Sequence, residues 1–235
     1  MTIKDEIESY WAGRSDTYDR FPASKSEDEE RRAYARLLGR LFNGNKLNIL
    51  DIGTGTGFLA LTLAEMGHNV TGVDLTEGML EKARRKAETT GLKIEFFLAD
   101  AEKLPFTDES FDAVISRYLL WTLPEPHEAL SEWSRVTKSG GSIICIEGKW
   151  RDSTLKGKMK KNLRKMGIVF HNKANPSKLG YAKETSKALP LVDGLTPDEA
   201  SILFRQSNLN NLSVETLHEI RNIQSRNMPI LYRLA

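Results

Sequence analysis

The stretch Ile49-Leu50-Asp51-Ile52-Gly53-Thr54-Gly55-Thr56-Gly57 joins an apolar strand to a glycine-rich turn, and a helical pattern follows it. Glycine has no Cβ, so the backbone can turn tightly there and approach a ligand closely. An acidic residue, Asp74, follows Gly53 by 21 residues at the end of the next apolar run. A carboxylate in that place can accept hydrogen bonds from both hydroxyls of a ribose. In this strand, turn and helix context, the combination indicates a site for a nucleoside-containing cofactor.

On both sides of this stretch, short apolar runs alternate with helical patterns, which is typical of a parallel sheet covered by helices on both faces. The expected strands are Leu47–Ile52, Asn69–Val73, Lys93–Leu98, Phe111–Ser116 and Ser142–Glu147. Thr76 and Gly91 are expected to cap the helix between the second and third strands. Pro126 is expected to open the helix before the fifth strand, and Gly140-Gly141 to end it. The pattern predicts an α/β fold with an open, doubly wound sheet.

The chain has 235 residues, enough for one sizeable domain with a modest insertion but not for two full-sized domains. We expect a helical N-terminal cover (1–45), a cofactor-binding core (46–149), an inserted helical lid (150–195) and a terminal helix with a strand pair (196–235). The cover should contain helices over about 3–20 and 27–43. Thr196 and Glu199 have the spacing of a helix capping box, and the late strands are expected at Leu212–His218 and Met228–Leu234.

Overall charge does not indicate a partner, because Lys+Arg 34 and Asp+Glu 32 leave a formal charge of +2. We expect no nucleic-acid partner. A single cysteine, Cys145, excludes an internal disulfide and a multi-cysteine metal site, which fits a reducing compartment. No apolar run approaches the ~18 residues that a membrane span needs. We therefore expect a soluble, cytoplasmic protein.

A nicotinamide dinucleotide is the main alternative ligand for the glycine-rich turn. It predicts the spacing G-x-G-x-x-G, whereas the third glycine here comes one residue early. The charged Asp51, two positions before the turn, would repel a pyrophosphate but would stabilise an α-amino group. These features favour a cofactor that contains an amino acid.

The sequence resembles the class I S-adenosylmethionine-dependent methyltransferases, particularly the branch similar to the ubiquinone/menaquinone-biosynthesis methyltransferases. The similarity covers about residues 46–148, with the family's motifs in order: Asp51–Gly57, Val73-Asp74-Leu75 with Met79, Ala99–Phe106, Phe111–Val114 and Arg135–Gly141. It implies a Rossmann-like, mostly parallel seven-stranded sheet with an antiparallel last strand. It also implies S-adenosyl-L-methionine as cofactor and S-adenosyl-L-homocysteine as product. The expected late strand pair fits this fold, because the segment between its strands is too short for a crossover helix.

The resemblance further implies a set of cofactor-binding residues. Candidates for the methionine end are Arg14, Tyr18, Asp51, Gly53, Thr54, Gly55, Gly57 and Arg117. Candidates for the ribose and adenine are Asp74, Leu75, Met79, Asp100 and Ala101. In this scheme Asp51 holds the amino group, Asp74 the ribose, and Asp100 with the Ala101 backbone the adenine edge. Core packing explains Leu75 and Met79 equally well, and a surface ion pair is the alternative for Arg14.

The acceptor is expected at the carboxyl ends of the strands, beside the segment Ser116–Pro124. Candidate substrate-binding residues are Tyr10, Trp11, Tyr118, Trp121 and His171. Core packing is the alternative for the aromatic residues after the fourth strand. His171 is the candidate for a general base, but a lone histidine in a basic segment usually has no special role. The sequence therefore predicts no catalytic residue. No Asp follows the fourth strand where a catechol-type enzyme binds magnesium, so we predict no metal.

The insertion is strongly basic, with eight Lys/Arg and one acidic residue between Arg151 and Lys173. A helix over 154–166 would place Leu155, Met159, Leu163 and Met166 on one face. Such a helix fits a lid over the acceptor, a peripheral membrane contact or a solvated helix packed on the core.

The sequence thus predicts metal-independent methyl transfer to a small-molecule acceptor. Aminocarboxypropyl transfer, a nicotinamide-dependent oxidoreductase and a non-catalytic cofactor-binding module are the alternatives. Neither the acceptor nor the oligomeric state follows from the sequence.

Overall fold

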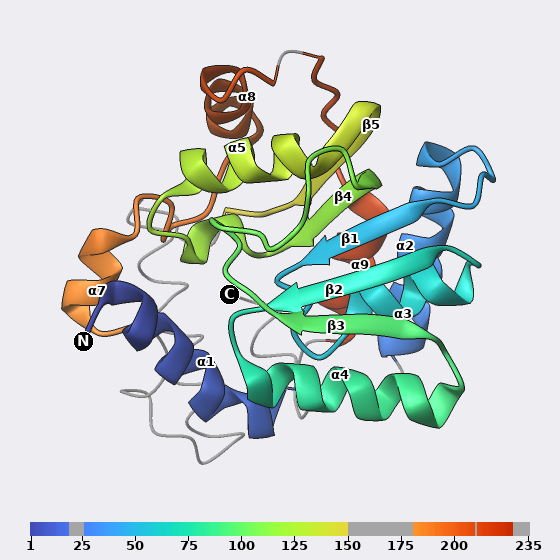
Figure 1. Ribbon diagram of the computed structural model, residues 1–235, viewed down its shortest axis with the longest axis horizontal. Coiled ribbons are helices and arrows are strands. Elements are labelled where there is room, and N and C mark those ends of the chain that lie inside the picture. Colours follow the sequence, from blue (N-terminus) through green and yellow to red (C-terminus); the bar gives the residue numbers. More distant parts are fainter. Residues whose placement is uncertain (19–25, 150–180, 210, 228–235) are drawn as a thin grey trace.

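The structure, a computed structural model, describes residues 1–18, 26–149, 181–209 and 211–227. Its centre is a parallel five-stranded sheet with the order β3-β2-β1-β4-β5 (Figure 1). The strands are β1 (Asn48–Ile52), β2 (Asn69–Asp74), β3 (Ile94–Leu98), β4 (Phe111–Arg117) and β5 (Thr137–Ile146). The five strands expected for the cofactor-binding core are therefore confirmed.

Helices cover both faces of the sheet and the carboxyl ends of its strands. They are α1 (Ile3–Tyr18), α2 (Ser26–Leu41), α3 (Phe58–Glu65), α4 (Glu77–Thr90), the short 3₁₀ helix η1 (Leu120–Thr122), α5 (Pro126–Val136), α7 (Lys183–Ala188), α8 (Pro197–Gln206) and α9 (His218–Asn227). Because successive side chains of a strand point to opposite faces, Ile49 packs with α2, α3 and α9 while Leu50 packs with α5 and α8. This is the doubly wound arrangement that the sequence predicts.

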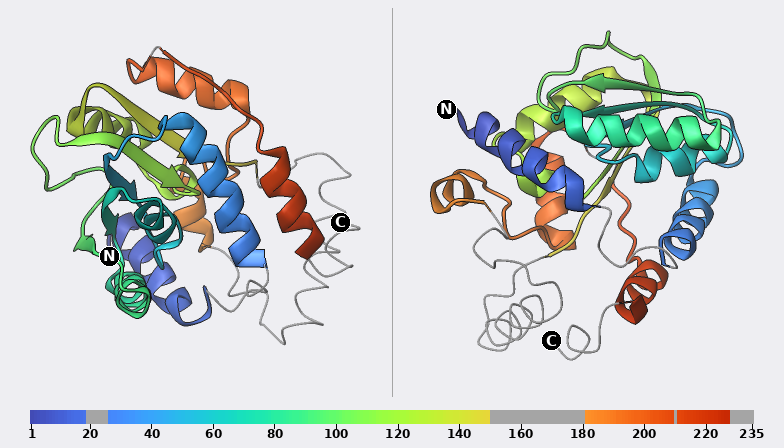
Figure 2. Two further views of the ribbon diagram at one scale, coloured as in Figure 1. Left: turned by 90° about the vertical axis from the view of Figure 1, so that its right-hand side faces the viewer. Right: turned by 90° about the horizontal axis from the view of Figure 1, so that it is seen from below.

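Helix α1 stands apart from both covering layers. It lies across the carboxyl ends of the strands and contacts α4 and α7 (Figures 1 and 2). Binding sites of open α/β sheets occur at these strand ends. Helix α1 is therefore placed where it can close over a ligand.

Four predicted helix ends agree with the structure. Thr76 is the N-cap of α4, and Gly91 ends that helix in the left-handed region with a φ of 68°. Pro126 opens α5. Thr196 and Glu199 form the predicted capping box at the start of α8, each side chain bonding the other's backbone N–H.

The predicted function of Gly140-Gly141 is wrong. Helix α5 already ends at Val136, and both glycines lie inside β5, where the register against β4 shifts between Phe111 and Ala113. A Cβ on Gly141 would stand 2.7 Å from the Asp112 carbonyl oxygen. The glycines therefore permit a bulge with close backbone contact rather than ending the helix.

The predicted strand Leu212–His218 is also wrong. Residues 211–217 have no regular structure, and His218 begins helix α9. Val214 is 56% exposed, whereas Ile220 and Ile223, at helical spacing, are buried against α2. The helical period buries more apolar surface here than the period of a strand. The partner strand predicted at Met228–Leu234 lies outside the described residues, so the antiparallel pair is not observed.

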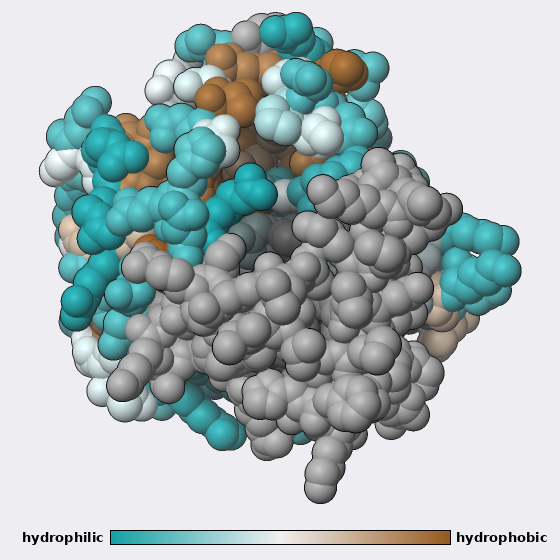
Figure 3. All heavy atoms as spheres, turned by 180° about the vertical axis from the view of Figure 1, so that it is seen from behind, coloured by the Kyte–Doolittle hydropathy of each residue, from teal (hydrophilic) through white to brown (hydrophobic). Residues whose placement is uncertain are grey.

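Most of the described surface is hydrophilic in the rear view, with smaller apolar areas (Figure 3). Within the described ranges, no helix combines the length and the apolar character that crossing a membrane requires.

Candidate active site

A cleft opens at the carboxyl ends of β1, β2 and β4. Helix α1 borders it on one side and the turn after β4 on the other. The empty space in it, including space that is open to solvent, is about 780 Å³. Open α/β sheets bind their ligands in a crevice at this edge of the sheet.

Most of the predicted site residues line this cleft. They are Trp11, Tyr18, Gly53, Gly55, Asp74, Leu75, Met79, Asp100, Ala101, Arg117 and Tyr118. The predicted residues that lie buried behind it are Asp51, Thr54 and Gly57. Those that belong to an aromatic cluster beside it are Tyr10, Arg14 and Trp121. His171 and the predicted basic helix over 154–166 lie outside the described residues.

The glycine-rich turn shapes the floor of the cleft. Gly53 and Gly55 both have left-handed φ values, 65° and 55°, which favour glycine. A Cβ on Gly53 would stand 2.7 Å from the side chain of Leu119. Apart from its two chain neighbours, no described residue has an atom within 4 Å of the place where a Cβ of Gly55 would stand. Gly53 therefore permits close packing of the turn, and Gly55 leaves its space open to the cleft.

Asp74, at the end of β2, ties the glycine-rich turn to the start of α4. Its Oδ2 accepts a hydrogen bond from the Gly55 N–H, and its Oδ1 accepts one from the Thr76 N–H, both at 2.9 Å. Burial raises the pKa of this carboxyl, and the backbone N–H donors oppose the shift. The carboxylate is thus held at the cleft wall by two elements, and each oxygen retains further acceptor capacity.

Asp51 lies one layer deeper and is only 2% exposed. Its Oδ2 accepts a hydrogen bond of 2.7 Å from the Thr54 hydroxyl. Burial raises the pKa of Asp51 to about 7. A cation bound nearby would favour the ionised form and lower this pKa.

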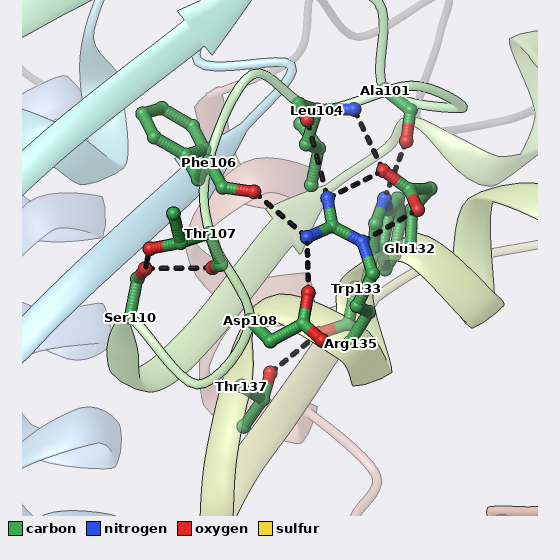
Figure 4. A network of polar contacts seen from close by, with 10 residues as sticks. All are labelled: Ala101, Leu104, Phe106, Thr107, Asp108, Ser110, Glu132, Trp133, Arg135 and Thr137. Atoms are coloured by element: carbon green, nitrogen blue, oxygen red, sulfur yellow. Dashed lines mark hydrogen bonds and ion pairs between the residues drawn. The ribbon is translucent and has the colours of Figure 1, made fainter.

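Helix α5 holds the loop after β3 that carries Ala101 and lines the cleft (Figure 4). The indole N–H of Trp133 donates to the Ala101 carbonyl at 2.9 Å, and Glu132 accepts from the Leu104 N–H. Arg135 donates to the carbonyl oxygens of Leu104 and Phe106. These bonds fix the loop backbone beside the cleft, so the shape of this wall depends on α5.

Lys4 connects α1 to the same loop. Its ammonium group forms ion pairs with the carboxylates of Asp100 and Glu102, and all three residues line the cleft. Asp100 also accepts from the Glu102 N–H at 2.9 Å. One end of α1 is therefore fastened at the cleft by charge.

Arg117, at the end of β4, is enclosed by aromatic rings and a carboxylate. Its guanidinium carbon lies 4.0 Å from the ring centroid of Phe58 and 4.9 Å from that of Tyr118. One Nη donates to Glu30 of α2 at 3.1 Å, and Gln224 of α9 donates to the same Glu30 oxygen at 2.7 Å. Neighbouring helices thus set the position of this cleft-lining cation.

An aromatic cluster borders the cleft beside α1 and the turn after β4. It consists of Tyr10, Trp11 and Tyr18 of α1, Trp121 of η1, and Tyr181. The indole N–H of Trp11 donates to the Tyr181 hydroxyl at 2.8 Å. The Arg14 guanidinium carbon lies 5.8 Å from the ring centroid of Tyr10 and 5.9 Å from that of Trp11. Residues far apart in the chain therefore form one apolar wall.

Several cleft residues were not predicted. They are Lys4, Ile7, Ile52, Val73, Thr76, Ala99, Glu102, Leu119, Thr122, Leu123 and Pro124. Those after β4 belong to the segment expected beside the acceptor. Lys4 had no local signal, because its partners are about a hundred residues away in the chain.

The methyltransferase domain model matches residues 50–145. The chain is 36% identical over 137 residues to phosphatidylethanolamine N-methyltransferase of Cereibacter sphaeroides, covering 57% of this chain and 64% of that one. It is 32% identical over 171 residues to demethylmenaquinone methyltransferase of Renibacterium salmoninarum, covering 70% of this chain and 69% of that one. The chain belongs to the class I S-adenosylmethionine-dependent methyltransferases.

A solved structure supports the fold of this methyltransferase. The PH0226 protein of Pyrococcus horikoshii matches 66% of this chain and 69% of its own with a TM-score of 0.54 and 26% identity. The cofactor is S-adenosylmethionine, as the resemblance implies, and the comparisons do not support the nicotinamide alternative. The chain spans only part of the length of some relatives: 64% of the Cereibacter sphaeroides enzyme and 40% of a demethylmenaquinone methyltransferase of Clavibacter sepedonicus.

Proposed function

We propose that this methyltransferase transfers the methyl group of S-adenosylmethionine, without a metal ion, to a small organic acceptor bound between α1 and the turn after β4. The division of the cleft is the observation that carries this proposal. Where β2 and β3 end, the cleft is lined by the carboxylates of Asp74, Asp100 and Glu102, and we call this its cofactor end. At the second half of α1 and the turn after β4 it is lined by the rings of Trp11, Tyr18 and Tyr118, and we call this its acceptor end. A nucleoside offers hydroxyl and amino donors to the first end, and an apolar acceptor suits the second.

The residues at the acidic end fit the nucleoside of the cofactor. Asp74 would accept hydrogen bonds from the ribose hydroxyls, since its oxygens retain acceptor capacity. Asp100 and the Ala101 backbone would bind the adenine edge. Leu75 and Met79 both line the cleft, and Met79 is also buried in the protein, so core packing and adenine contact are compatible for it.

The methionine part would lie along Gly53, Thr54, Gly55 and Gly57. Asp51 would stabilise its amino group from behind the turn, by charge rather than at the cleft surface. Arg117 lines the cleft, and its Nε has no hydrogen-bond partner among the described residues. A buried N–H without a partner is costly, so the carboxylate of the cofactor is a suitable acceptor for it. Arg14 and Tyr18 would also contact the methionine part of the cofactor.

The bound cofactor supplies an electrophilic methyl group on a sulfonium whose positive charge disperses during transfer. Alignment of the acceptor and exclusion of water then provide most of the rate enhancement. Trp11 and Tyr118 would contribute to both alignment and water exclusion, because their rings line the cleft. Tyr10 and Trp121 would support them from behind, packed in the same cluster. His171 stays a candidate acceptor residue outside the described residues.

Turnover of acceptors with methyl-labelled S-adenosylmethionine tests this proposal. The first panel should contain amino-headgroup and quinol acceptors, since relatives carry the names phosphatidylethanolamine N-methyltransferase and demethylmenaquinone methyltransferase. Mass spectrometry of the product separates methyl from aminocarboxypropyl transfer, and turnover should survive a chelator. Binding of S-adenosylhomocysteine without methylation of any acceptor, in the panel or in metabolite fractions, would instead favour a non-catalytic module.

A further inference from the structure

The end of β5 binds three consecutive backbone amides of the turn after β4. The Ile146 carbonyl accepts a hydrogen bond of 2.8 Å from the Tyr118 N–H. The next residue, Glu147, uses one oxygen, Oε1, to accept from the Leu119 N–H at 2.9 Å and the Leu120 N–H at 2.8 Å. A side chain beyond the last residue of the sheet thus fixes the backbone of this turn.

The turn needs such support because its backbone is unusual. Tyr118 has a φ of 58°, in the left-handed region that bulky residues rarely adopt. Successive amides around a left-handed residue form a concave site that attracts an anion. The Glu147 carboxyl occupies this site. A strained residue of this kind persists only where neighbouring contacts hold it.

The other carboxyl oxygen of Glu147 distinguishes it from an ordinary turn cap. Its Oε2 is buried and has no hydrogen-bond partner among the described residues. Burial raises the pKa of Glu147 to about 7, against the effect of the two backbone donors. Glu147 does not line the cleft, so it has no direct access to a bound ligand there.

The turn itself borders the cleft. Tyr118 and Leu119 both line it, and Leu119 packs against Gly53 of the glycine-rich turn. The indole N–H of Trp121 donates to the Tyr118 carbonyl at 2.8 Å, which joins the aromatic cluster to the same backbone. A change at Glu147 would therefore move the wall where the acceptor is expected.

We propose that Glu147 is a positioning residue: it holds the turn Tyr118–Leu120 in the left-handed conformation that presents the acceptor wall, and it acts through this turn rather than on the acceptor. This inference rests on the proposed function for the identity of the wall. The neutral amide of glutamine also has an oxygen that accepts two N–H donors, so Glu147→Gln preserves this action while Glu147→Ala removes it.

Amide hydrogen exchange measured by NMR tests the turn without an acceptor. In Glu147→Ala we expect the Leu119 and Leu120 amides to exchange at least about tenfold faster, since each loses the carboxylate oxygen that accepts its hydrogen bond. Amides of β1 should be unchanged. Glu147→Gln should keep both amides protected. Glu109→Ala is the matched control, because Glu109 accepts one backbone N–H, from Ser139, at an exposed site.

Steady-state kinetics with an acceptor found in the panel complete the test. Glu147→Ala should lower kcat/KM for the acceptor about tenfold or more, with S-adenosylhomocysteine affinity within about threefold, and Glu147→Gln should stay within about threefold of the parent. If Glu147→Gln lost as much kcat/KM as Glu147→Ala while its Leu119 and Leu120 amides stayed protected, the proposal would be overturned. The negative charge of the carboxylate, rather than its hold on the turn, would then be needed for turnover. Unchanged exchange in Glu147→Ala, or faster exchange throughout β1, would overturn it too. If the parent protein methylates no acceptor, the proposed function fails, while the exchange data still test the turn.

Discussion

The two ends of the cleft are built in different ways. At the cofactor end, the glycine-rich turn, Asp74 and the loop around Asp100 lie at the ends of three neighbouring strands, and nearby backbone N–H groups donate to the carboxylates of Asp74 and Asp100. At the acceptor end, the wall combines α1, the turn after β4 and Tyr181, which are joined by ring contacts and by the hydrogen bond from Trp11 to Tyr181. The cofactor end is thus a property of the strand order, whereas the acceptor end depends on contacts between distant segments. The two ends should therefore respond to different substitutions.

The largest effect is expected at the cofactor end. Asp74→Ala removes the proposed ribose acceptor and leaves the Gly55 and Thr76 amides without theirs. Affinity for S-adenosylhomocysteine should fall about 10- to 100-fold, corresponding to ~1–3 kcal/mol. Calorimetry measures this change. Asp112→Ala is the control, since Asp112 also accepts a backbone N–H, from Asn48, but lies near the start of β4. Parent-like affinity in folded Asp74→Ala would remove Asp74 from the site.

A pH dependence of about tenfold is expected from Asp51. Burial raises the pKa of Asp51 to about 7, so its carboxyl is mostly neutral at pH 6 and mostly ionised at pH 8. Only the ionised form stabilises the amino group of the cofactor, so affinity for S-adenosylhomocysteine should rise about tenfold between these pH values. In Asp51→Asn this rise should disappear. A rise of the same size in that variant would assign the dependence to another group.

The contrast between the two ends also explains what the sequence could predict. Gly53 and Asp74 were found because a turn and a carboxylate at fixed distances along one βαβ unit have a direct geometric meaning. Lys4, Glu30 and Glu147 were missed because each acts on a residue far away in the chain or across the sheet. No local pattern marks such a pair.

The wrong predictions have a related cause. Leu212 and Val214 alternate like a strand, but Leu217, Ile220 and Ile223 have the spacing of a helix face that packs on α2. A short segment can satisfy both periods, and the tertiary contact decides between them. A tertiary contact also decides at Gly141, because a Cβ there would stand too close to the Asp112 carbonyl oxygen of the neighbouring strand.

A smaller effect, confined to the acceptor end, is expected for Trp11. Trp11→Ala removes a ring that lines the cleft and packs with Trp121, so kcat/KM for the acceptor should fall about three- to tenfold. Trp11→Phe keeps an aromatic ring but loses the hydrogen bond to Tyr181, and it should lose less. Affinity for S-adenosylhomocysteine should change less than about threefold in both. An equal loss of cofactor affinity and turnover would show that the two ends are not separable at this residue.

The smallest effect is expected where α1 joins the two ends. Lys4 pairs with Asp100 and Glu102 at the cofactor end, while Trp11, on the same helix, lies at the acceptor end. Partial burial lowers the pKa of Lys4, but the two carboxylates outweigh it and raise the pKa, so the ammonium stays charged around neutral pH. The Lys4 side chain is 38% exposed, and pairs of this kind contribute up to about 1 kcal/mol.

Lys4→Met should therefore release that end of α1 and increase the dissociation rate of S-adenosylhomocysteine about two- to fivefold in stopped-flow measurements. Added salt should raise the rate of the parent protein toward that of the variant, because salt screens exposed charges. Lys46→Met, at an exposed lysine just before β1, serves as control and should leave the rate unchanged. Slower dissociation in Lys4→Met would mean that Lys4 competes with the adenine for Asp100 instead of closing α1 over it.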